Sequence, residues 1–99
     1  MDDKLVKAAK IAVRTTTDDV DLIADIWDLI QAAFADLRVA GIENKPAEGE
    51  DYSPLYKRAV ILYCKANFGN NPDREKLQTA YESLKTYMSL DDDYRVISQ

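Results

Sequence analysis

The residue types that most often perform enzymatic chemistry are nearly missing from this sequence. It has no histidine and one cysteine, Cys64, so it lacks the commonest general base and the partner for a Cys–His nucleophilic pair. Its three glycines are scattered and form no phosphate-binding loop. The run Asp91–Asp93 lacks the alternating oxygen ligands and the turn glycine of a calcium loop. We therefore expect no enzyme, no cofactor and no metal site.

The other candidates for function are charged side chains at helical spacing. A basic stripe comprises Lys4, Lys7 and Lys10, and an acidic stripe comprises Asp21, Asp25 and Asp28. Spacings of three and four residues put each stripe on one side of a helix. Either stripe could simply be a solvated face. The alternative is that the basic stripe of one subunit faces the acidic stripe of the next, which makes these six residues the candidate subunit interface.

Apolar periodicity and capping residues predict an all-α fold, a compact bundle of about four helices with an extended C-terminal tail. The expected helices span approximately residues 3–13, 18–40, 54–68 and 73–89. Thr17, Ser53 and Asp73 are the expected N-caps, and Gly69 is expected to end the third helix in a left-handed conformation. The chain is long enough for one modest core, so residues 1–90 are expected to form a single domain.

The third helix is apolar nearly all the way round, which places it at the centre of the bundle. Its Cys64 is expected to be buried and inert, since nothing nearby in the sequence would lower the pKa of the thiol. The predicted core residues share the apolar sides of the second, third and fourth helices. They are Ile23, Trp27, Ile30, Phe34, Leu37, Leu62, Phe68, Leu77, Tyr81 and Leu84.

Three segments leave alternatives open. The apolar arc of the second helix is wide enough to contact another subunit, although a four-helix core could also absorb it. The long loop 42–52 is either functional or a plain surface connection. In the tail 91–99, Tyr94, Val96 and Ile97 alternate with Arg95 and Ser98 as in a strand. This tail is either disordered or adds to the surface of another protein.

A set of residues in fixed order resembles a known family. The set comprises Asp18, Asp19, Leu22, Ile23, Ala32, Ala33, Asp36, Leu37, Ala40, Gly41 and Ile42, then Pro54, Leu55, Ala59, Tyr63, Lys65–Gly69, Leu77, Ala80, Tyr81 and Ser83–Lys85. Over residues 3–90 this pattern resembles the head-to-tail connector proteins of long-tailed phages, also called head-completion or DNA-packaging adaptor proteins.

The resemblance implies a structural virion protein that forms a ring, typically dodecameric, between the capsid portal and a tail or stopper protein. Such a ring takes part in head completion, retains the packaged DNA and later lets it pass. The portal-binding element is expected in the tail, at Tyr94, Arg95, Val96 and Ile97. The net charge of −5 agrees with a channel through which DNA passes without specific binding.

Two other functions stay open at this level: a small helical DNA-binding regulator, whose fourth helix would read DNA, and a monomeric adaptor module. Met1 is followed by two aspartates rather than by the apolar stretch of a signal peptide, and no apolar run is long enough to span a membrane. The chain is therefore expected to be made in the bacterial cytoplasm and to act in the virion, at the head–tail interface.

Overall fold

The computed structural model describes residues 2–16, 18–46 and 49–91. Within these ranges the chain forms four helices and no strand. They are α1 (Asp3–Ala12), α2 (Val20–Val39), α3 (Pro54–Asn67) and α4 (Arg74–Ser89). The predicted all-α fold of four helices is confirmed. The predicted tail residues 92–99 lie outside the described part of the chain.

All four helices begin or end one or two residues away from the predicted bounds, and local contacts explain the differences in α2 and α3. The second helix begins at Val20 and not at 18, because the carboxylate of Asp19 accepts hydrogen bonds from the backbone N–H groups of Asp21 (2.9 Å) and Leu22. Ser53 and Asp73 do occupy N-cap positions, but neither side chain makes a capping hydrogen bond. The third helix ends at Asn67, because Phe68 is extended and Gly69 follows in the left-handed conformation.

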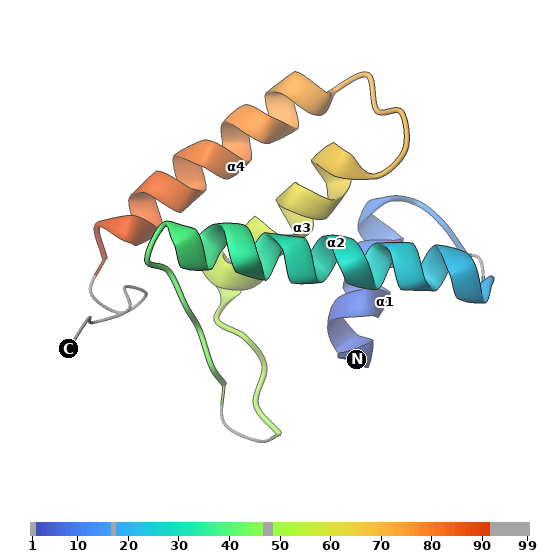
Figure 1. The fold of residues 1–99 in the computed structure, drawn as a ribbon, viewed down its shortest axis with the longest axis horizontal. Coiled ribbons are helices and arrows are strands. Elements are labelled where there is room, and N and C mark those ends of the chain that lie inside the picture. Colours follow the sequence, from blue (N-terminus) through green and yellow to red (C-terminus); the bar gives the residue numbers. More distant parts are fainter. Residues whose placement is uncertain (1, 17, 47–48, 92–99) are drawn as a thin grey trace.

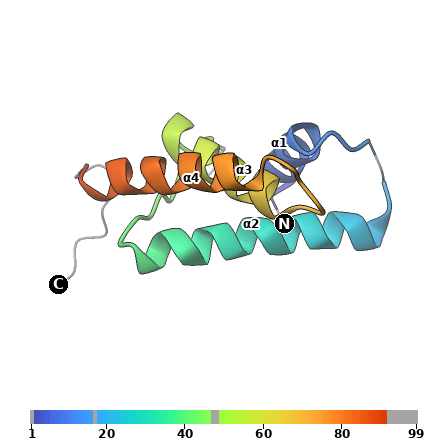
Figure 2. The same cartoon turned by 90° about the horizontal axis from the view of Figure 1, so that it is seen from above.

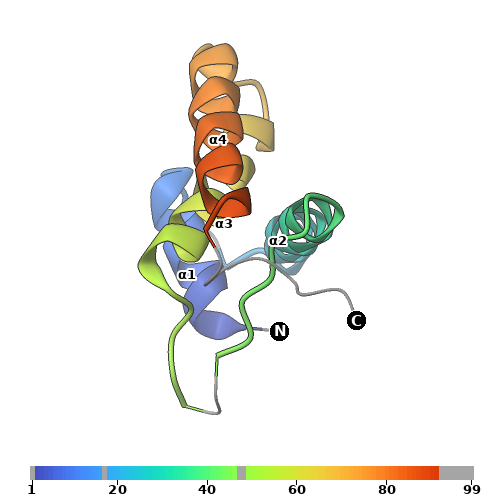
Figure 3. The same cartoon turned by 90° about the vertical axis from the view of Figure 1, so that its left-hand side faces the viewer.

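The third helix lies at the centre of the bundle, as its apolar surface predicted, because α3 packs against each of the other three helices. Its neighbour α4 follows after the loop 68–73 and returns beside it (Figure 1). Seen from above and from the end, α2 forms one layer of the molecule, while α1, α3 and α4 lie together on its other side (Figures 2 and 3). The outward side of α2 and the outward side of the layer formed by α1, α3 and α4 therefore face in different directions.

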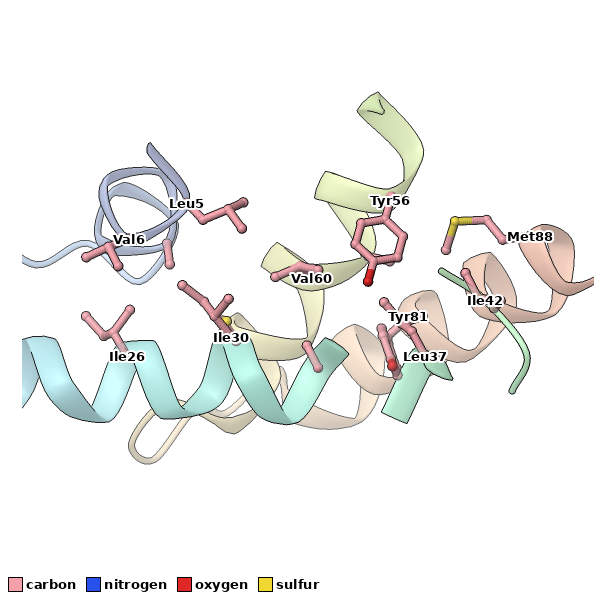
Figure 4. Close-up of a cluster of buried hydrophobic side chains, with 14 residues drawn as sticks. Leu5, Val6, Ile26, Ile30, Leu37, Ile42, Tyr56, Val60, Tyr81 and Met88 are labelled. Carbon is pink, nitrogen blue, oxygen red and sulfur yellow. The ribbon is translucent and has the colours of Figure 1, made fainter. Parts of the chain in front are cut away.

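The core runs along the contact between these layers (Figure 4). Ile30, Leu37 and Tyr81 are fully buried in it. The partly buried side chains packed against it include Ile23, Trp27, Phe34, Leu62, Phe68 and Leu84. Leu77 is half-buried and lies outside this cluster. The core also contains Cys64, which was expected to be buried, and residues outside the predicted core set, namely Leu5, Val6, Ala9, Ile26, Ala33, Ile42, Tyr56, Ala59, Val60 and Met88.

The incomplete burial of Leu62 has a geometric cause. The side of α3 turned away from α2 and α4 meets only α1, which is short. Leu62 therefore lines an open hollow of about 440 Å³ together with Lys57 and Arg58. A helix can touch three neighbours and still keep one of its apolar residues near solvent.

Both ends of the loop 42–52 are anchored. Ile42 is fully buried at one end. At the other end Tyr52 stacks on Tyr56, with 5.6 Å between ring centroids, and also lies against Phe34. Such aromatic pairs stabilise beyond the area that they bury. The two ends of the loop are thus fixed to the core by these side chains.

Candidate functional site

The basic stripe runs along α1, with Lys4 and Lys7 exposed and Lys10 half-buried, and two of its three lysines form ion pairs within the chain. Lys4 pairs with Asp51 at 3.2 Å, and Lys10 pairs with Asp18 at 3.5 Å. Lys7 is exposed and makes no ion pair with a described residue. The Lys4 pair is exposed on both sides and therefore weak, at about 0–1 kcal/mol.

The acidic stripe lies on the outward side of α2. Asp21, Asp25 and Asp28 are all exposed and make no ion pair with a described residue. The structure thus places the two predicted stripes on different helices and on different outward surfaces. The ion pair of Lys10 with Asp18 joins the basic stripe to the segment before α2 and does not involve the acidic stripe.

A groove between α2 and the end of α3 adjoins the acidic stripe. Its volume is about 580 Å³. Apolar side chains of both elements line it, with Leu22 and Leu29 from α2 and Phe68 after α3, and Asp25 and Asp28 lie among its lining residues. Part of the apolar arc of α2 remains uncovered in this groove. We call it the α2–α3 groove.

An apolar side chain also stands out on α1. Although it is apolar, Ile11 lies one turn after Lys7 on the polar side of the helix, and it is 68% exposed. Together with Lys7, Lys10 and the half-buried Ile23, it lines a hollow beside the start of α2. Sequence reasoning missed both Ile11 and the groove. The available signal was an isoleucine interrupting a polar helix face.

Asp36 links the second and fourth helices. Its carboxylate accepts hydrogen bonds from the Tyr81 hydroxyl and from Lys85 Nζ at 3.1 Å, and Lys85 also pairs with Glu82 at 3.0 Å. Burial alone would raise the pKa of Asp36, but these hydrogen bonds and the lysine charge together lower it. Burial and the hydrogen bond to Asp36 raise the pKa of Tyr81. This network holds two helices together, so we assign it a role in folding and not in binding or catalysis.

The structure bears on the expectation that the chain has no reactive thiol and no metal site. Burial raises the pKa of the Cys64 thiol to about 12, so at neutral pH the thiol is protonated and unreactive. The described residues hold no cluster of three or more potential metal ligands. Within the same ranges, no helix combines the length and the apolar character needed to cross a membrane.

Comparisons with known proteins give one match. The sequence model of a family described as phage connector protein matches residues 5–95, which is most of the chain. Searches of the curated proteins and of the solved structures found no match to this chain. The matched range includes α2, α3 and α4, all of α1 after Lys4, the acidic stripe, Lys7, Lys10 and Ile11.

Proposed function

The chain belongs to the phage connector protein family, and from this premise we propose that it forms a ring between the capsid portal and the tail or stopper. Connector proteins are structural rather than catalytic components of the virion. In the proposed ring each subunit contacts two neighbours, the portal on one side and the stopper on the other. The ring completes the head, retains the packaged DNA and later lets it pass.

The observation that carries this proposal is the separation of charge between the two layers. The outward side of α2 carries Asp21, Asp25 and Asp28, whereas α1 carries the lysine stripe. The helix α3, which lies in the same layer as α1, contains Lys57, Arg58 and Lys65 and no acidic residue. Opposite charge on different outward surfaces favours head-to-tail association of identical subunits.

Charge also bears on DNA. The chain carries 18 acidic and 13 basic residues, and proteins that grip phosphates need clustered basic side chains instead. Some basic side chains of α4 are already engaged. Lys85 pairs with Asp36 and Glu82, and the Arg74 guanidinium donates to the carbonyls of Ala66 and Gly69. These contacts favour a connector over a regulator whose fourth helix reads DNA.

We place the portal contact in the tail, at Tyr94, Arg95, Val96 and Ile97, which lie outside the described residues. An extended segment with alternating apolar side chains could bind by adding a strand to its partner. Each tail would bind weakly because ordering the backbone costs about 1–2 kcal/mol per residue. A ring that presents many tails together would offset this cost through effective concentration.

The experiment compares the full chain with a variant lacking residues 92–99 on portal-bearing, DNA-filled heads. We expect the truncated protein to keep its melting temperature but to lose attachment, so that the heads leak DNA or fail to join tails. A matched control replaces Tyr94 and Ile97 by alanine without shortening the chain, and attachment should fall here too. Normal attachment of both variants would move the portal contact to the helices or to the loop 42–52.

The ring itself is tested by the mass of the assembly. Light scattering of the purified chain, alone and with portal protein, separates a closed ring from the monomer expected of an adaptor. A protein that stays monomeric under both conditions would contradict the proposed function.

A further inference from the structure

The exposed isoleucine on α1 has surroundings that point to its occupant. Single apolar residues on a surface are common and need no explanation. Ile11, however, is 68% exposed on a helix face shared with Lys7 and Lys4. It is an apolar projection next to positive charge. A matching surface would be an apolar hollow next to negative charge.

The chain itself carries such a hollow. The α2–α3 groove is lined by Leu22, Leu29 and Phe68, and Asp25 and Asp28 belong to the same lining. Its volume of about 580 Å³ exceeds that of an isoleucine side chain several times over, so Ile11 could enter with part of its helix. Both carboxylates are exposed and form no ion pair with a described residue, which leaves them available to a lysine.

We propose that the α2–α3 groove binds the Ile11 surface of a second copy of this chain, with Lys7 of that copy facing Asp25 and Asp28. This inference rests on the proposed function, because it names the contact between neighbouring subunits of the ring. It extends the charge pairing between stripes by giving the contact an apolar centre. A buried apolar centre within a charged rim is the usual organisation of a specific interface.

The Ile11 surface and the α2–α3 groove of one chain cannot bind each other. Ile23 lines the hollow beside Ile11, whereas the neighbouring Leu22 lines the groove. Successive residues of a helix point about 100° apart, so the two surfaces lie on different sides of α2. A contact between two different surfaces is heterologous, and repeating it produces a ring if the rotation closes and a filament if it does not.

The contact can be tested by disulfide cross-linking. The test variant carries Ile11→Cys and Ala32→Cys, because Ala32 lines the groove and is half-buried. The matched control carries Ile11→Cys and Val39→Cys, since Val39 is 90% exposed on the same helix but outside the groove. Native Cys64 is buried and should not react. Wild-type protein measures any background.

We expect mild oxidation to give the test variant a ladder of covalent dimers and larger species on a non-reducing gel. The control variant should form several-fold less. Ile11→Asp, which places a carboxylate against Asp25 and Asp28, should weaken self-association by at least about tenfold in sedimentation. Its melting temperature should stay unchanged, because residue 11 is exposed.

The results separate this inference from the proposed function. If the protein forms rings, but the control cross-links as well as the test variant and Ile11→Asp assembles normally, the groove is not the subunit contact and the connector function stands. If the wild-type chain neither self-associates over its soluble range nor joins portal-bearing heads, both proposals fail.

Discussion

The core around α3 and the surface around Ile11 are both built from aliphatic side chains, but they differ in what surrounds them. Ile30 is fully buried in a cluster that draws residues from all four helices and contains no charged group. Ile11 is largely exposed and has lysines on its helix face. Burial of Ile30 therefore contributes to folding. Ile11 can contribute only when another molecule covers it, so the same residue type serves stability in one region and association in the other.

The largest expected effect comes from truncating the core. Ile30→Ala should lower the free energy of unfolding by about 2–5 kcal/mol, through lost burial and a residual cavity. Ile11→Ala should change it by less than about 0.5 kcal/mol. Urea denaturation monitored by circular dichroism measures both. Equal losses at the two isoleucines would contradict the comparison.

A smaller loss is expected at the half-buried side of α3. Leu62→Ala should cost about 1–2 kcal/mol, less than Ile30→Ala, because part of the leucine is already in contact with water. Lys57→Ala, on the same hollow, should have little effect on unfolding. A cost at Leu62 equal to that at Ile30 would show that the hollow is closed in solution.

Charge reversal should affect association but leave folding intact. Lys7→Glu with Lys10→Glu should weaken assembly about tenfold, because each subunit contact loses two attractive pairs, worth about 0–1 kcal/mol each, and gains repulsion. Asp25→Lys with Asp28→Lys in the same chain should partly restore it. Sedimentation at low and high salt measures the effect, which should shrink as salt screens the charges. Normal assembly of the first double variant would refute the charged contact.

The smallest effect concerns pH and the network at Asp36. Because folding lowers the pKa of this carboxyl, its contribution is fully present above the unfolded-state pKa of about 3.9. It is lost as the pH falls through the lower folded-state pKa. Asp36→Asn should therefore lower the melting temperature modestly near pH 6 and by progressively less as the pH falls below about 3.9. Thermal melts across this range measure the difference.

The matched variant Tyr81→Phe removes one of the two hydrogen-bond donors to Asp36. It should keep part of the pH dependence, because Lys85 remains. Parallel melting profiles for the wild type and Asp36→Asn would contradict the role of this network.

Local rules determined much of the fold from the sequence. Apolar periodicity placed four helices within two residues of their observed bounds, and the all-round apolar surface of α3 placed it at the centre. Composition argued against catalytic and metal sites. The order of motif residues pointed to the connector family. These features depend on neighbours within a few turns of chain or on residue counts, so they can be read without knowing how the helices pack.

Only the tertiary structure decided which apolar and charged residues meet. Leu62 was expected in the core, yet it is half-buried because α1 is too short to cover that side of α3. Periodicity put Lys85 and Asp36 on separate helices, and packing made them an ion pair. The α2–α3 groove exists because Phe68 leaves the helix and meets α2. Each outcome depends on contacts between residues far apart in the chain, which periodicity along one helix cannot encode.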